Sequence, residues 1–433
     1  MGEWHVLKYV IFAKSLNIVY CVNLLSGAFL SFTEEEYDLL FHKEKWDSNF
    51  NKIKKFVECG ILVNFNEYEI IQTLIKLDNT YGEKLILSIC PTMDCNFNCP
   101  YCFEEHRKGK MSLEIQDKII ELVNKISKNE KINKLQITWF GGEPLLYPDI
   151  IESLSDRLIK IAEKNKLKYF SNIITNGYLL NQKNADILTK AKVDNYQITL
   201  DGVGSIHNKT RCLKNGEPTF DKIIDNIKNT KITGIIKIRQ NIYKDNLNNI
   251  QELKDFLDNI KKTSVNNITY YFSDICNNDN IENNKNIKLV SNLDFNKSKV
   301  FLENIFIPKK KKYSCGAQKM NFITIDELGN LYKCRDKIKL NDSFGNIIKW
   351  DPNNPLFTAK RPDMITNYIN TIGAINDEEC KNCVWFPVCV GGCPMYRIYY
   401  QKKCIPYKGY EKEFVLKIAE QYNKNEQEKS RTD

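Results

Sequence analysis

The stretch Cys90-Pro-Thr-Met-Asp-Cys95-Asn-Phe-Asn-Cys99-Pro-Tyr-Cys102-Phe103 places three cysteines at the spacing Cys-x3-Cys-x2-Cys. Iron–sulfur cubanes are ordinarily held by four cysteine thiolates. Three thiolates on one short loop therefore leave one iron open to another ligand, as catalytic metal sites keep one position open. A zinc site and an accident of a cysteine-rich chain are the alternative interpretations of this triplet taken alone.

The length of 433 residues suits roughly two to four domains with a large core. The chain has 15 cysteines and begins without a basic, apolar signal segment, so we expect a reducing cytoplasm and thiolates kept for metal. Lys8, Lys14 and Asn17 interrupt the apolar pieces near the N-terminus, so no membrane span is expected. The formal charge of +9 overstates the charge of a protein with thiolate-bound clusters and does not indicate a nucleic-acid partner.

From residue 84 on, apolar strand patterns alternate with helical patterns. Six strand–helix units predict parallel strands with right-handed crossovers, and six are too few for a closed eight-stranded barrel. We expect an α/β fold with a partial (β/α)6 TIM-like barrel, whose ligands lie at the carboxyl ends of the strands. The predicted strands are Leu85–Ser88, Lys134–Thr138, Lys168–Thr175, Asn195–Leu200, Ile235–Ile242 and Asn267–Phe272.

A second element, Trp139-Phe140-Gly141-Gly142-Glu143-Pro144, follows the second predicted strand. Together with the cysteine triplet after the first strand, it resembles the radical S-adenosylmethionine (SAM) enzymes. The resemblance implies a 4Fe–4S cluster on Cys95, Cys99 and Cys102, whose free iron chelates the amino and carboxylate groups of SAM. Reductive cleavage of SAM then yields a 5'-deoxyadenosyl radical that removes hydrogen from a substrate.

The same resemblance implies contacts to SAM. We expect Gly141, Gly142 and Glu143 to meet the methionyl ammonium, because glycine lets a backbone approach a ligand closely. The two arginines below are candidates for its carboxylate, with a surface ion pair as the alternative for each. The other expected contacts are Tyr101 and Phe103 beside the adenine, the strand-end residues Thr175, Asn176 and Thr199, and the arginines Arg211 and Arg239.

The C-terminal region carries a cysteine array that resembles the SPASM domain, the auxiliary-cluster module of radical enzymes that act on peptides and proteins. A zinc ribbon would need only four cysteines, so zinc is the minority interpretation. The resemblance implies two further 4Fe–4S clusters, three in all. The outer cluster takes Cys380, Cys383, Cys389 and Cys404, and the inner cluster takes Cys315, Cys334 and Cys393.

The inner set is one ligand short. Anaerobic sulfatase-maturing enzymes resemble this chain but carry a further cysteine at the position of Asn321. We therefore expect an open iron there, available to a substrate thiolate, a water or another side chain. Those enzymes also place an aspartate general base directly after the cysteine that matches Cys334, where this chain has Arg335 and then Asp336. Because a shift of one residue re-aims a side chain in extended structure, sulfatase maturation becomes the runner-up.

Residues 1–80 resemble the small winged-helix-like α+β domain that recognises leader peptides, with a cap on the barrel as the alternative. The predicted strands are 5–12, 18–23, 28–31 and 61–65, Thr33 and Glu36 predict a capping box, and a helix is expected over 47–59. The expected division is residues 1–80 for this domain, 81–275 for the barrel, 276–310 for a linker, 311–410 for the SPASM domain and 411–433 for a charged helical tail.

The resemblance implies a peptide maturase that removes hydrogen from a ribosomally made precursor, consisting of leader and core, and installs a cross-link. A substrate cysteine on the inner iron would favour a thioether, and a carbon–carbon bond is the alternative. Formylglycine formation and a noncatalytic iron–sulfur peptide-binding module are the other hypotheses. The implied electron donor is a flavodoxin or ferredoxin. Asp201 and Asp336 are weak candidates for a general base, and each is also expected to cap a helix or join a surface network.

Overall fold

The computed structural model describes residues 3–80, 82–274, 315–371, 374, 377–400, 402, 404–405 and 408–429. These residues form two compact units. The first unit contains residues 3–80, residues 315–318 and the described residues from 370 on, and the second contains residues 82–274 and 319–369. The expected SPASM segment, 311–410, is thus divided between the units. The expected linker 276–310 lies outside the described residues.

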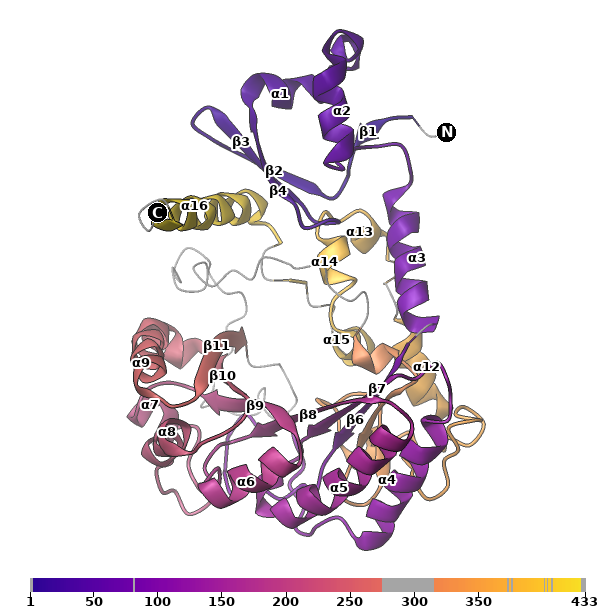
Figure 1. The fold of residues 1–433 in the computed structure, drawn as a ribbon, viewed down its shortest axis with the longest axis vertical. Coiled ribbons are helices and arrows are strands. Elements are labelled where there is room, and N and C mark those ends of the chain that lie inside the picture. Colours follow the sequence, from indigo (N-terminus) through magenta and orange to yellow (C-terminus); the bar gives the residue numbers. More distant parts are fainter. Residues whose placement is uncertain are drawn as a thin grey trace. The chain divides into compact units, whose positions relative to one another are not determined.

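A nine-stranded sheet forms the centre of the second unit, in the order β11-β10-β9-β8-β7-β6-β12-β13-β14. Its strands β6 to β11 are labelled in Figure 1. Its six parallel strands from β6 to β11 confirm the partial-barrel prediction. They are β6 (Lys84–Ile89), β7 (Lys134–Trp139), β8 (Lys168–Thr175), β9 (Val193–Leu200), β10 (Ile235–Ile242) and β11 (Asn267–Asp274).

The connecting helices are amphipathic, and Figure 1 shows them along one face of the sheet. In α4, for example, Ser112 caps the N-terminus through a bond from the Ile115 amide, and Ile115, Ile119 and Leu122 are buried. This periodicity gives each helix one apolar face for the sheet. The helices are α4 (Leu113–Ile126), α5 (Pro148–Lys164), α6 (Gln182–Lys190), α7 (Ser205–Asn208), α8 (Phe220–Asn229) and α9 (Ile250–Thr263).

A seventh parallel strand, which the sequence did not predict, extends this sheet. Strand β12 (Phe322–Ile325) pairs with β6, so that Thr324 lies opposite Ser88. It continues through an antiparallel ladder into β13 (Asn330–Tyr332) and β14 (Gly345–Asn346), and helix α12 (Pro362–Asn370) follows. The hairpin therefore brings the polypeptide around Cys334 into the second unit.

The first unit contains two small antiparallel sheets. Strand β1 (His5–Val6) pairs with β5 (Leu62–Val63), and a separate sheet has the order β2-β3-β4. The single strand predicted over 5–12 is therefore wrong. The chain turns at residues 8–9, where the Lys8 amide donates to Glu67 Oε1 at 3.0 Å, and its two ends join different sheets. The three-stranded sheet consists of β2 (Val10–Ser15), β3 (Ile18–Asn23) and β4 (Phe29–Thr33).

The first helix of this unit starts as predicted. Thr33 caps α1 (Glu34–Leu39), and Glu36 completes the capping box. Helix α2 (Phe50–Glu58) ends before Gly60, whose φ of +68° suits glycine. Helix α3 (Glu67–Thr80) was not predicted. Short 3-10 helices complete the two units: η1 (Lys43–Lys45), η2 (Asp47–Asn49), η3 (Pro144–Leu146), η4 (Lys244–Asn249), η5 (Gly316–Gln318) and η6 (Leu340–Asp342).

Near the C-terminus, the described residues form the helices α13 (Glu378–Lys381), α14 (Phe386–Cys389), α15 (Pro394–Tyr399) and α16 (Glu411–Lys429). All of them except α15 contribute to a core shared with the N-terminal sheet. Helix α16 packs on β2 and β3, and its residues Phe414, Val415 and Ile418 are buried in the core of this unit. The tail is thus a helix with an apolar stripe, and not only a charged end. Among the residues that the structure describes, no helix is both long and apolar enough to cross a bilayer.

Candidate active site

The cysteine loop starts where β6 ends, at the carboxyl edge of the parallel sheet. The Cys90 amide donates to Ile325 of β12 at 2.9 Å, which ties the start of the loop to the unpredicted strand. Cys95 is buried and Cys99 and Cys102 are half-buried. The Cys102 amide donates to the Cys99 carbonyl at 3.1 Å and closes a tight turn between these two thiols.

The Gly-Gly-Glu-Pro turn after β7 packs directly on this loop. The Gly142 amide donates to the Thr92 carbonyl at 3.2 Å, and the Glu143 amide donates to the Asp94 carbonyl at 2.8 Å. A Cβ atom on Gly142 would lie only 2.1 Å from the Asp94 carbonyl oxygen. Glycine is therefore needed at position 142 for close packing on the backbone of the cysteine loop, a second reason beside the expected approach to a ligand.

The Glu143 carboxylate joins the ends of two neighbouring strands. It is fully buried, its Oε1 accepts from Thr175 Oγ1 at 2.7 Å, and its Oε2 accepts from the Asn176 amide at 2.7 Å. Burial raises the pKa of Glu143 above its usual range, although these donors oppose the shift. Asn176 Nδ2 also donates to Asn96 Oδ1 at 2.7 Å. The structure thus brings together Glu143, Thr175 and Asn176 beside the cysteine loop.

A buried polar network crosses from the cysteine loop to the end of β9. The Tyr101 hydroxyl donates to Asp201 Oδ2 at 2.6 Å, and Arg211 Nη1 donates to the Tyr101 oxygen at 2.9 Å. Asp201 also accepts from Thr210 Oγ1 at 2.6 Å, so its carboxylate belongs to a network. Asp201 Oδ1 and Arg211 Nε are buried without a hydrogen-bond partner among the described residues. Orphaned polar atoms of both charges are what a bound zwitterionic molecule would satisfy.

The wall formed by β9, β10 and β11 carries further polar side chains. Arg239 lies opposite Thr199 in one ladder and opposite Tyr271 in the other. Its Nη2 donates to Ser273 Oγ at 3.2 Å, while its Nε is buried without a partner in the described part of the chain. The Tyr271 hydroxyl donates to Gln197 Oε1 at 2.9 Å.

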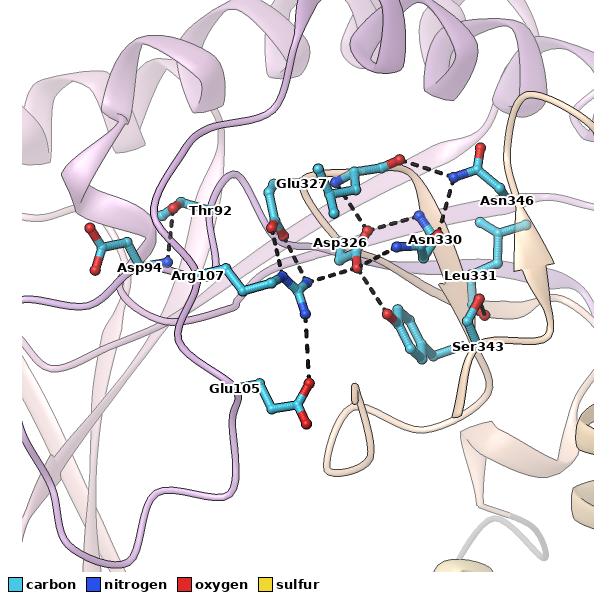
Figure 2. Close-up of polar contacts among 12 residues, drawn as sticks. Thr92, Asp94, Glu105, Arg107, Asp326, Glu327, Asn330, Leu331, Ser343 and Asn346 are labelled. Carbon is cyan, nitrogen blue, oxygen red and sulfur yellow. Dashed lines mark hydrogen bonds and ion pairs between the residues drawn. The ribbon is translucent and has the colours of Figure 1, made fainter. Parts of the chain in front are cut away.

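An ionic junction that the sequence did not reveal joins the cysteine loop to the β12–β13 hairpin (Figure 2). Arg107 Nε donates to Glu327 Oε1 at 3.0 Å, and its Nη2 donates to Asp326 Oδ2 at 2.9 Å. Asp326 also accepts from the amides of Leu328 and Asn330, which fixes the turn of the hairpin. Both carboxylates are almost fully buried. Arg107 therefore links the cysteine loop to the β12–β13 hairpin, which is followed by Cys334.

Glu104 is a second residue that the sequence analysis missed. It is buried two positions after Cys102, and burial, followed by the charges of Asp336 and Glu143, raises its pKa to about 8. Asp336 itself is exposed. The sequence offered one signal, the pair Glu104 and Glu105 shortly after the cysteine triplet. A local sequence pattern does not reveal that only Glu104 of this pair is buried. Phe103 is half-buried against the cluster of Cys90 and Met93.

In the first unit, the four cysteines expected to hold the outer cluster line one cavity. Cys380, Cys383, Cys389 and Cys404 face it together with Trp385. A cavity with four thiols in its wall fits a cluster that is bound only by cysteine. Within the described residues, no three His, Cys, Asp or Glu side chains converge as ligands of a single metal ion.

The expected inner set is divided between the units. Cys315 and Cys393 belong to the first unit and Cys334 to the second. Asn321, at the position of the missing cysteine, forms hydrogen bonds with β6 and with the segment just before it. Its carbonyl accepts from the Ile86 amide at 2.8 Å, and its side chain donates to the Gly82 carbonyl at 3.5 Å.

Comparison with known proteins gives the same fold. One solved structure, native anSMEcpe with bound AdoMet and Kp18Cys peptide, is 22% identical, covers 79% of this chain and 98% of its own, and has a TM-score of 0.57. Streptococcus suis SuiB bound to the precursor peptide SuiA is 17% identical, covers 92% of this chain and 98% of its own, and has a TM-score of 0.50. At these identities the likeness concerns the fold alone.

The curated relatives found by sequence include two kinds of enzyme. A probable GTP 3',8-cyclase of Saccharolobus islandicus is 31% identical over 42% of this chain, which spans only 54% of that relative's length. A cysteine-type anaerobic sulfatase-maturating enzyme of Clostridium novyi is 26% identical over 69% of this chain and 85% of its own. Residues 89–268 match the sequence model of the Radical SAM superfamily. That match begins at the last residue of β6 and runs through the cysteine loop and the next four strands, so this part of the chain is a radical SAM domain.

Proposed function

We propose that this chain is a radical SAM enzyme that modifies a peptide, with its first cluster on Cys95, Cys99 and Cys102. The observation that carries the proposal is the bonded contact between the cysteine loop and the Gly-Gly-Glu-Pro turn, with orphaned charged atoms close by. When bound, the reduced cluster and SAM would supply the 5'-deoxyadenosyl radical that removes a hydrogen atom from the substrate.

In this proposal, the chain's own residues bind and orient SAM. The orphaned Arg211 Nε and Asp201 Oδ1 offer a cation and an anion inside a buried network. The Glu143 side chain is occupied by Thr175 and the Asn176 amide, so its main role is to hold the ends of β7 and β8 together. Thr199 and Arg239 lie further along the same edge, where Arg239 keeps a free Nε among the described residues. Tyr101 orders Asp201 and Arg211, and Phe103 is proposed to lie beside the adenine.

We further propose two auxiliary 4Fe–4S clusters. Cys380, Cys383, Cys389 and Cys404 would hold the outer one, which is supported by the cavity that they line. Cys315, Cys334 and Cys393 would hold the inner one. Asn321 stands at the position of the missing cysteine, and its side-chain Nδ2 donates to the Gly82 carbonyl at 3.5 Å, so three protein thiolates are proposed for this cluster. The inner iron would then be open to a substrate thiolate.

The product that this arrangement favours is a thioether. A cysteine S–H and a C–H of the precursor are replaced by one C–S bond, so two hydrogens and two electrons must leave. One electron from a reduced flavodoxin or ferredoxin would be needed to cleave SAM, and the hydrogen atom taken from the C–H would leave in 5'-deoxyadenosine. The thiol proton would be lost to solvent, and the remaining electron would be taken up by the auxiliary clusters that the C-terminal cysteines would hold. A carbon–carbon cross-link follows the same electron count.

Residues 3–80 are proposed to bind the leader of the precursor. Strands β2 and β4 are the edges of the three-stranded sheet, and an extended peptide adds to such an edge through main-chain hydrogen bonds. Because Trp385 and Phe414 share a core with this region, its deletion would expose apolar surface throughout the first unit. Leader dependence is therefore better tested by truncating the peptide than by truncating the enzyme.

Formylglycine formation is the second candidate. It is favoured by the sulfatase-maturating relative, which covers 69% of this chain, and by Asp336, whose charge acts on the buried Glu104 beside the cysteine loop. The two candidates differ in what happens to the substrate sulfur, which a thioether keeps and formylglycine loses.

The deciding experiment incubates the anaerobically reconstituted full chain with SAM, dithionite and cysteine-containing peptides encoded by neighbouring short reading frames, each with and without its leader. Mass spectrometry is expected to show loss of two hydrogens, retention of sulfur and dependence on the leader. Loss of sulfur from a short leaderless peptide would instead establish formylglycine formation. SAM cleavage without any change in either kind of peptide would contradict peptide modification.

A further inference from the structure

The cavity lined by the four C-terminal cysteines is surrounded by cations that the ligand pattern does not require. Arg397 of α15 is the most closely engaged, because its Nη2 donates to Cys380 Sγ at 2.9 Å. Its side chain is only 15% exposed, so water screens this contact little. The same guanidinium donates from Nη1 to Asp377 Oδ2 at 3.0 Å and from Nε to the Gly391 carbonyl.

Two lysines continue this arrangement. Lys408 lies 3.8 Å from Cys404 Sγ and also contacts Glu379. Lys402 pairs with Asp377 at 3.1 Å and with Glu379 at 2.5 Å. The two acids therefore hold the cations in place, and Asp377 also accepts from the Cys380 amide at 3.0 Å and caps α13.

We propose that Arg397 is a positioning residue that tunes the outer cluster by donating a charged hydrogen bond to the Cys380 sulfur, thereby favouring the reduced cluster. This inference rests on the proposed function, since it assigns the outer cluster to Cys380, Cys383, Cys389 and Cys404. Reduction adds negative charge to a cluster and its sulfurs. A nearby guanidinium therefore stabilises the reduced form more than the oxidised form and raises the reduction potential.

The geometry ranks the neighbouring charges. Arg397 touches sulfur at 2.9 Å and is mostly buried, whereas Lys408 stands 3.8 Å away with a side chain that is 37% exposed. Asp377 is an anion in the same group, so its removal should act in the opposite direction. Lys381 is a matched control, because its side chain is 42% exposed and its ammonium contacts Glu378 and the Tyr68 ring rather than a sulfur.

The test is a redox titration followed by electron paramagnetic resonance on the reconstituted full chain. The Cys95, Cys99 and Cys102 triple alanine background removes the first cluster, and the signal lost on Cys389→Ala identifies the outer cluster. We expect Arg397→Gln to shift its midpoint to a more negative value, Lys408→Gln to shift it less in the same direction, Asp377→Asn to shift it to a more positive value and Lys381→Gln to leave it unchanged.

The opposite shifts separate tuning from a purely structural role, which would make Arg397→Gln and Asp377→Asn alike in lost iron or disturbed signal. If Arg397→Gln fails to assemble the cluster, the midpoint shifts of Lys408→Gln and Asp377→Asn test whether nearby charges tune the outer cluster. Unchanged midpoints, or shifts of the same sign, with full iron content would overturn the tuning role while leaving the clusters in place. A wild-type chain that lacks the Cys389-dependent signal would instead refute the outer cluster itself.

Discussion

The chain holds cysteines in two contrasting electrostatic environments. In the cysteine loop of the second unit, burial raises the pKa of Cys95 to about 12 and that of Cys99 to about 11. The charge of Arg211 opposes the pKa shift at Cys99, but this arginine donates its hydrogen bond to the Tyr101 oxygen. In the array of the first unit, burial also raises the pKa of Cys380, but Arg397 donates to its sulfur and opposes the shift.

This difference suggests a division of labour. The loop is set in a buried network of charges and backbone contacts, where Arg211 acts on Cys99 through its charge and donates its hydrogen bond to Tyr101. The array instead places cations directly beside its sulfurs, within an ion-pair group that is partly exposed to solvent.

The largest effect is expected at the buried junction of the second unit. Arg107→Met would leave Asp326 and Glu327 buried without their cation, which typically costs about 3–5 kcal/mol in free energy of unfolding. Urea unfolding of the metal-free chain measures this. Lys402→Met, in the partly exposed group of the first unit, should cost roughly 1 kcal/mol or less. Equal losses in the two variants would remove the contrast between the regions.

The next largest loss of stability is expected where the Gly-Gly-Glu-Pro turn packs on the cysteine loop. Gly142→Ala places a Cβ atom 2.1 Å from a backbone oxygen, and overpacking of this kind costs roughly 1–3 kcal/mol. We expect a lower melting temperature and reduced iron content. Gly345→Ala is the matched control, since its nearest atom would be 3.7 Å away. A Gly142→Ala chain with normal stability and iron would show that the two loops can separate freely.

A smaller effect is expected within the polar network. Tyr101→Phe removes the hydroxyl that joins Asp201 and Arg211, and leaving such buried groups unpaired costs roughly 1–3 kcal/mol. The Michaelis constant for SAM should rise along with the loss of stability. Tyr271→Phe removes a hydroxyl from a side chain that is partly exposed, and should change both quantities much less. A normal Michaelis constant in Tyr101→Phe would argue against a SAM site at this network.

The smallest effect is a pH dependence confined to the second unit. Burial, followed by the charge of Arg211, holds the pKa of His207 well below its ordinary value. The unfolded chain protonates this histidine near pH 6.5, so it binds more protons than the folded chain below that pH, and the free energy of unfolding falls as the pH falls. His207→Gln should remove this contribution, up to about 1.4 kcal/mol per pH unit. Parallel stability curves for variant and wild type below pH 6.5 would contradict it.

Local patterns were enough to predict the elements that carry the site. The six parallel strands and the Thr33 capping box follow from apolar periodicity and capping chemistry, and the Gly-Gly-Glu-Pro turn lies against the cysteine loop at the strand ends. Strand β12 was missed because four residues give little periodicity and their partner, β6, lies more than two hundred residues away in the chain.

The charges that matter most were also beyond local reasoning. Arg107 meets Asp326 and Glu327 only because β12 joins the sheet, and Arg397 reaches Cys380 only after α13 and α15 pack together. Similarly, the apolar stripe of α16 is buried against β2 and β3, which lie at the other end of the sequence, so its role could not be predicted locally.

The central claim is that Cys95, Cys99 and Cys102 hold a cluster that cleaves SAM, while the other cysteines hold two further clusters. The most direct measurement is iron content together with dithionite-dependent SAM cleavage, for the wild type and for the variant with all three cysteines changed to alanine. The account predicts about twelve irons and 5'-deoxyadenosine formation in the wild type, and about eight irons with no cleavage in the variant. Bound zinc, or cleavage that survives the triple substitution, would contradict it.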